Sequence, residues 1–213
     1  MKKALIIVAA SLAGLAVLGG GFYATAQVFD TTKTDHDTAS RSVRHLVIKA
    51  DSGDIELVPG GRSVEIETTR QYFLDSPDVS RSVEDGTLTL ESECGNLVGF
   101  SCDTDYRVEV PKGVTVDVRT YAGDIKADGI AARSIEARSY VGDVDIDATR
   151  QSDVTARTNV GDINVELPKG KYNIDSDTAV GDSDVDDGLV TSDHARHSVD
   201  MQSDVGDVDV SVR

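Results

Sequence analysis

The sequence predicts an all-β protein: a right-handed, β-solenoid-like stack of coils of about 19–20 residues, preceded by one N-terminal transmembrane helix. Three observations carry this prediction. A Gly-Asp pair recurs along the second half of the chain. Apolar and polar residues alternate on both sides of each pair, which is typical of half-buried strands. An uncharged apolar segment lies near the N-terminus.

The N-terminal segment predicts a membrane anchor in residues 1–26. Lys2 and Lys3 precede the uncharged residues 4–23, which are long enough to span a bilayer. The lysines favour a single-pass topology with a cytoplasmic N-terminus and an extracytoplasmic C-terminal domain. The alternative is a signal peptide cleaved near Ala26, because Ala24-Thr25-Ala26 has the small-x-small form, and the domain would then be secreted. Residues 27–43 are polar and are expected to form a linker.

Residues 44–113 predict the strands and hairpins of an N-terminal part of the β domain. Residues 46–50, 53–58, 63–68, 87–90 and 106–110 read as strands. Such atypical terminal units usually cap a repeat array. In an exported protein the two cysteines, Cys94 and Cys102, are expected to form a disulfide that closes a short loop.

Residues 114–213 predict the Gly-Asp repeat coils. A glycine can adopt a conformation forbidden to other residues, so each is expected to form a corner where the inward pattern restarts. The expected corners are Gly53, Gly123, Gly142, Gly161, Gly181 and Gly206. Seven positions before the last five corners, one buried column is expected from Val116, Ile135, Val154, Ile174 and Val199. The position directly before each glycine is also expected to point inward: Ala122, Val141, Val160, Val180 and Val205.

Three segments together resemble a known family. They are residues 51–55, the stretch from Cys94 through Cys102 to residues 106–113, and the later Gly-Asp coils. The pattern resembles the bacterial putative-adhesin domain of β-strand-repeat proteins, a family of unknown function common on envelope proteins, over roughly residues 44–213. The resemblance implies a right-handed β-solenoid-like fold outside the membrane, and it supplies no catalytic residues.

The charge of the chain excludes one class of partner and raises one metal hypothesis. A formal net charge of −17 argues against nucleic-acid binding, which needs the opposite sign. Aspartates that alternate beside the corners could in principle bind Ca²⁺ through their oxygens. These are Asp143, Asp145, Asp162, Asp182, Asp184 and Asp207. The repeat lacks the Gly-Gly-x-Gly-x-Asp form of calcium rolls, so a solvated acidic face is favoured and no cofactor is predicted.

One outward row of side chains suggests a binding surface. Arginines recur at one repeat position and tyrosines two residues later, and together they suggest a ligand face for an anionic glycan or a lipid headgroup. These residues are Arg119, Tyr121, Arg138, Tyr140 and Arg157. The alternative is an ion-pair ladder with neighbouring carboxylates. His194 and His197 beside Asp193 read as an exposed loop rather than a metal site.

The function predicted from these features is non-catalytic. The domain is expected to act in adhesion, envelope sensing or scaffolding, with an envelope protein, a glycan or a lipid as partner. The alternative is a carbohydrate-active enzyme on acidic polysaccharide, because solenoids of stacked strands also host such enzymes. The absence of Trp and the scarcity of aromatic residues argue against that alternative.

Overall fold

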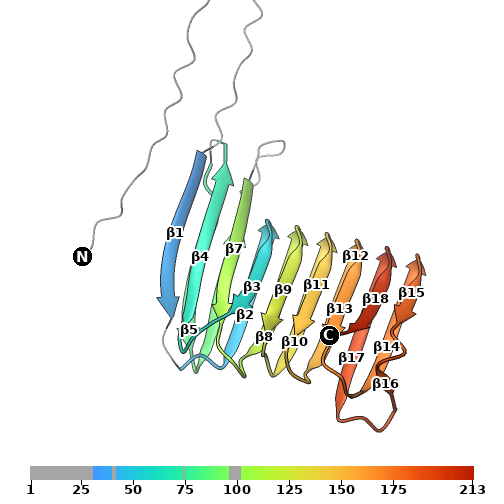
Figure 1. The fold of residues 1–213 in the computed structure, drawn as a ribbon. Helices are drawn as coiled ribbons and strands as arrows, with labels where there is room; N and C mark the ends of the chain where they lie inside the picture. Colours follow the sequence, from blue (N-terminus) through green and yellow to red (C-terminus); the bar gives the residue numbers. More distant parts are fainter. Residues whose placement is uncertain (1–30, 40–41, 74, 96–101) are drawn as a thin grey trace, which may run out of the picture.

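The computed structural model describes residues 31–39, 42–73, 75–95 and 102–213, and its strands form two nine-stranded sheets that face each other (Figure 1). In spatial order the first sheet contains β1 (Thr31–Ala39), β4 (Val64–Tyr72), β7 (Cys102–Val110), β3 (Ile55–Pro59), β9 (Ile125–Ile130), β11 (Val144–Ala148), β13 (Ile163–Leu167), β18 (Val208–Val212) and β15 (Ser183–Val185).

The second sheet contains, from the opposite end, β16 (Val190–Thr191), β14 (Lys171–Val180), β17 (His197–Val205), β12 (Asp153–Val160), β10 (Ser134–Val141), β8 (Thr115–Ala122), β2 (His45–Ser52), β6 (Thr87–Glu93) and β5 (Asp78–Glu84). Within the described residues, no helix is long and apolar enough to cross a membrane. The predicted anchor, residues 1–26, lies outside the described part of the chain.

Each coil is a strand of the second sheet, a corner, and a strand of the first sheet. The coils β8–β9, β10–β11 and β12–β13 stack in parallel and in register, with Ile135 opposite both Val116 and Val154. The predicted column therefore forms, and its members are buried except for Ile174, which is partly buried. Its residues are mainly β-branched, as suits the narrow space between two sheets. The β-solenoid-like, all-β prediction is confirmed.

The coils do not stack in chain order at the C-terminal end. β17 lies between β12 and β14, and β18 lies between β13 and β15, so the last coil of the sequence sits inside the one before it. The apolar content of the two coils explains the exchange. β17–β18 buries Met201 and Val208, whereas β14–β15 has Ser176 and Ser183 at the matching positions and can tolerate the open end.

The corner glycines have the predicted role. Their φ angles lie between 122° and 147°, a region that L side chains rarely adopt. The prediction for the residue before each glycine was wrong, because Val141, Val160, Val205 and Val180 are 45%, 49%, 46% and 63% exposed. The last inward position is instead the Ser or Thr two residues earlier, such as Ser139 and Thr158. The corner has already turned at the valine, so its side chain lies on the outer rim.

The N-terminal end of the stack is closed by antiparallel strands. β4 pairs with β7, and β5 forms a hairpin with β6 through Asp85 and Gly86, both at positive φ. Residues 31–39, expected to belong to the polar linker, instead form β1, which pairs with β4 along its whole length. The polarity that suggested a linker reflects an edge position, since only Ala39 of this strand is buried.

Replacing Gly142 with Ala should destabilise the domain strongly. The new Cβ would collide with the carbonyl of Gly123, and the residue would have to hold φ at 144°. We expect a loss of roughly 2–4 kcal/mol in the free energy of unfolding, measured by urea denaturation. Gly61→Ala is the matched control, because nothing lies within 4 Å of its Cβ position. Equal midpoints for the two variants would show that the corner does not need glycine.

Candidate functional site

A chain of aspartates runs along the corners of the stack. At each corner the backbone N–H of the Asp donates to the Oδ1 of the corresponding Asp in the neighbouring coil, at 2.8–2.9 Å. In spatial order the chain is Asp105, Asp54, Asp124, Asp143, Asp162, Asp207 and Asp182. These carboxylates therefore act as backbone acceptors that join the coils. Burial raises the pKa of Asp105, the first member.

Hydroxyl groups join the same corners from inside. Ser139 donates to the carbonyl of Gly123 and Thr158 to that of Gly142, both at 2.9 Å, and Thr120, Ser203 and Thr178 make the equivalent bonds. The inward Ser or Thr three residues before each glycine thus supplies a hydrogen-bond donor to a corner carbonyl that lies outside the strand pairing.

The aspartates considered for Ca²⁺ lie on two surfaces rather than in one cluster. Asp143, Asp162, Asp182 and Asp207 belong to the corner chain, where their backbone N–H groups all donate to a neighbouring carboxylate. Asp145 and Asp184 are strand residues of the first sheet, and Asp145 accepts a bond from Asn164 at 2.9 Å. Among the described residues, no group of three or more His, Cys, Asp or Glu could hold a metal ion.

The predicted arginine row is present on the outer face of the second sheet, and its charges are paired. Arg119 lies 3.0 Å from Asp117 and 3.2 Å from Glu136, which also contacts Arg138 at 2.6 Å. Arg157 lies 3.1 Å from Asp200. The row is therefore an ion-pair ladder, and an anionic ligand would have to displace these carboxylates.

The two predicted tyrosines form a stacked pair beside this ladder. The rings of Tyr121 and Tyr140 are 4.7 Å apart at their centroids and are inclined by 5°. They are 62% and 47% exposed, and the other large hydrophobic side chains that are exposed among the described residues are all valines. The centroid distance matches the spacing of adjacent strands, so the in-register β8–β10 pairing itself produces the stack.

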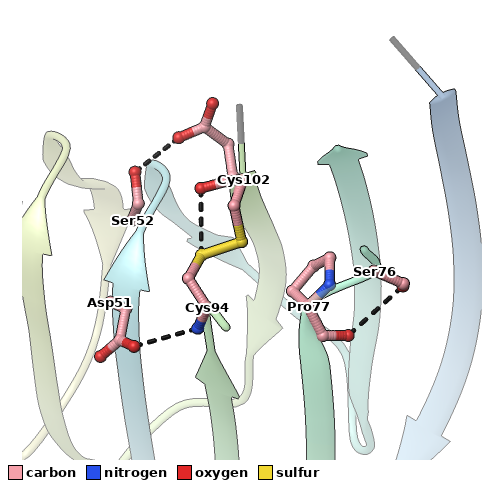
Figure 2. Close-up of a disulfide and its surroundings, with 7 residues drawn as sticks. Asp51, Ser52, Ser76, Pro77, Cys94 and Cys102 are labelled. Carbon is pink, nitrogen blue, oxygen red and sulfur yellow. Dashed lines mark hydrogen bonds between the residues drawn. A yellow bond between two sulfur atoms is a disulfide. The ribbon is translucent and has the colours of Figure 1, made fainter. Parts of the chain in front are cut away.

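A shallow hollow of about 280 Å³ adjoins the tyrosines. Its floor and walls come from β2, β6 and β8: Lys49, Ala50, Asp51, Glu91, Ser92, Glu93, Arg119 and Thr120, with Tyr121 and Tyr140 at one end. The carboxylate of Asp51 accepts the backbone N–H of Cys94 at 3.0 Å (Figure 2), so it leans toward the end of β6.

A disulfide braces the same region. Cys94, after β6, and Cys102, at the start of β7, are joined with their Cα atoms 6.0 Å apart (Figure 2). They link the two sheets where the other coils use a glycine corner, so the crosslink replaces a corner at this end of the stack. Residues 96–101, within the loop, lie outside the described residues.

The histidines of the last loop are not brought together around Asp193. His197 Nδ1 lies 3.3 Å from Asp153, while the backbone N–H of His194 lies 3.4 Å from the hydroxyl of Ser192. Their neighbours give them separate, structural contacts.

Comparisons with known proteins agree with this architecture. The model of the Toastrack DUF4097 family matches residues 39–213. The chain belongs to this family. No curated protein matches the chain.

Among solved structures, the Toastrack fold resembles a "putative cell adhesion protein" from Clostridium sporogenes. That likeness has 16% identity and a TM-score of 0.64, and it covers 86% of this chain and 100% of the other. A "putative adhesin" from Bacteroides fragilis has 12% identity and a TM-score of 0.39, and covers 86% and 97%. At 16% identity, the likeness to the Clostridium sporogenes protein shows the fold alone.

The sequence reasoning missed the hollow of this Toastrack domain. Lys49 and Asp51 lie beside β8 because β2 pairs with β8 across about 70 residues of sequence, and Glu91 and Glu93 lie one strand further. No local pattern identifies these partners. The one available signal was the Gly-Asp at Gly53, which marks residues 45–59 as a coil in its own right.

The corner aspartates of the Toastrack domain give a matched pair of variants. Asp143→Ala removes the acceptor of the Asp162 N–H and should cost about 0.5–1.5 kcal/mol in the free energy of unfolding. Asp182→Ala is the control: it lies in the outermost coil, no described backbone N–H donates to its carboxylate, and it should cost under about 0.5 kcal/mol. Asp143→Asn keeps an acceptor and should restore stability in urea denaturation. A loss that is the same in all three variants would contradict the assigned role.

Proposed function

We propose that this Toastrack domain is a non-catalytic adhesion module outside the membrane, which makes contact through the outer face of its second sheet. The observation that carries the proposal is the exposed Tyr121–Tyr140 stack on a rigid, hydrogen-bonded sheet. Exposed aromatic side chains supply large contact area at little conformational cost. The Clostridium sporogenes neighbour, described as a "putative cell adhesion protein", supports the same class of function.

The contact face is broad and shallow, which favours binding over catalysis. The charged groups beside the tyrosines are already paired with one another. Asp105, a carboxyl group whose pKa is raised by burial, holds the Asp54 N–H and so belongs to the corner chain. A glycosidase would need two carboxyl groups on either side of a sugar bond. The contacts described here support a structural role for the carboxylates instead.

In this proposal, residues 4–23 tether the domain to the cell membrane as a single span. Lys2 and Lys3 keep the N-terminus in the cytoplasm, and the domain faces outward. An envelope protein, a glycan or a lipid is then within reach of the exposed face.

Adhesion should depend on the tyrosine pair. Liposomes that carry the full chain should be retained on surfaces coated with bacterial envelope material, and Tyr121→Ala/Tyr140→Ala should reduce the retained fraction severalfold. Val160→Ala is the control, because Val160 is 49% exposed but lies on another coil. Retention that is unchanged in the double variant would exclude this face as the contact surface.

A separate experiment tests the proposed orientation of the chain in the membrane. Alkaline phosphatase fused after Arg213 should be active in cells, and deletion of residues 4–23 should abolish that activity. The protein purified from the membrane fraction should have an intact mass that corresponds to a chain still carrying the residues before Ala26. A mature protein that begins near Gln27 would replace the anchor with a cleaved signal peptide.

A further inference from the structure

The hollow beside Tyr121 has one aromatic wall and a polar rim. We propose that it binds an uncharged pyranose ring of a glycan, which stacks on the free face of Tyr121. The inference rests on the proposed adhesion function and names the chemistry of its ligand. It differs from recognition of an anionic glycan, which the arginine row suggested from the sequence.

The free ring face follows from the geometry of the stack. Tyr140 covers one face of Tyr121, at 4.7 Å between centroids and 5° between planes. The opposite face points along the sheet toward β2, where Asp51 occupies the facing position between the pairs Ala50–Thr120 and Ser52–Ala122. Asp51 leans toward the end of β6 because its carboxylate holds the N–H of Cys94. The ring face of Tyr121 is therefore open to the hollow.

The charges around the hollow favour a ligand without charge. Lys49 lies 3.4 Å from Glu91, and Arg119 is held by Asp117 and Glu136. An anion would have to break these pairs, and the added carboxylate of Glu93 at the wall would repel it. Of the three carboxylates that line the hollow, Glu91 is paired with Lys49 and Asp51 is held by the N–H of Cys94, so only Glu93 could receive a cation without losing a described contact.

The distribution of polar and apolar groups favours a sugar over an aromatic ligand. Only one end of the hollow is aromatic, while Lys49, Asp51, Glu91, Glu93 and Arg119 surround the rest. A pyranose ring presents axial C–H groups on its face and hydroxyl groups around its edge, and hydroxyls both donate and accept. The carboxylates can accept from those hydroxyls and Lys49 can donate to them without losing their present partners. A flat aromatic ring would leave this polar rim unused.

The test uses the full chain in a zwitterionic detergent without sugar headgroups. Saturation-transfer NMR, with the tyrosine ring protons irradiated, should show transfer to the C–H protons of methyl β-glucopyranoside or cellobiose. Tyr121→Ala should weaken the titrated affinity roughly three- to tenfold, while Tyr121→Phe and Val160→Ala should not change it. Circular dichroism and thermal melting should be the same for every variant, since Tyr121 is exposed.

Each of the following binding results, like the absence of any sugar binding, would overturn the inference. They are tighter binding of glucuronate than of the neutral glucoside, tighter binding of indole than of either sugar, and affinity that is unchanged in Tyr121→Ala. If neither sugar binds and liposome retention still depends on the tyrosine pair, the ligand class is wrong and the adhesion function stands. If retention does not depend on the tyrosines, the proposed function itself fails.

Discussion

The stacked glycine corner is the constraint on which the remaining structure depends. At every corner but the outermost, the glycine N–H donates to the carbonyl of the residue before the next glycine in the stack, as from Gly142 to Val160 at 2.9 Å, and the Asp beside it joins the same two coils through its carboxylate. A Cβ at any of these glycines would meet the backbone of the neighbouring coil. The close approach fixes the spacing and register of both sheets at once, because every coil must place the same short segment against its neighbour.

The candidate binding face is a consequence of this register. Arg119, Arg138 and Arg157 face one another across adjacent strands, and so do Tyr121 and Tyr140, because the corners hold β8, β10 and β12 without slippage. Like charges side by side are unfavourable, and the carboxylates of Asp117, Glu136 and Asp200 compensate them within the same face. Repetition thus makes a rigid surface on which two aromatic rings remain exposed without a flexible loop to support them.

The two ends of the stack are protected by different means. At the N-terminal end β1, β4 and β5 cover the edges in antiparallel pairing, and the Cys94–Cys102 disulfide takes the place of a glycine corner. At the other end β14 and β15 are rich in aspartate, with Asp175, Asp177 and Asp184 exposed. Charge on an edge strand discourages the addition of further strands, so the least apolar coil is the one that can remain outermost.

The sequence by itself determined the repeat, the glycine corners, the buried column and the pairing of the two cysteines, because each depends on a local pattern that recurs in every coil. Only the tertiary structure decided which coils are neighbours. β17–β18 lies inside β14–β15 because Met201 and Val208 need cover on both sides, a comparison that no single coil reveals. Tertiary structure also decided that the polar residues of β1 form an edge strand. It likewise decided that the valine before each glycine is exposed, because the chain has already turned the corner there. The hollow beside Tyr121 also required the structure, since its walls come from β2 and β6, which the chain brings to β8 only through pairing between distant segments.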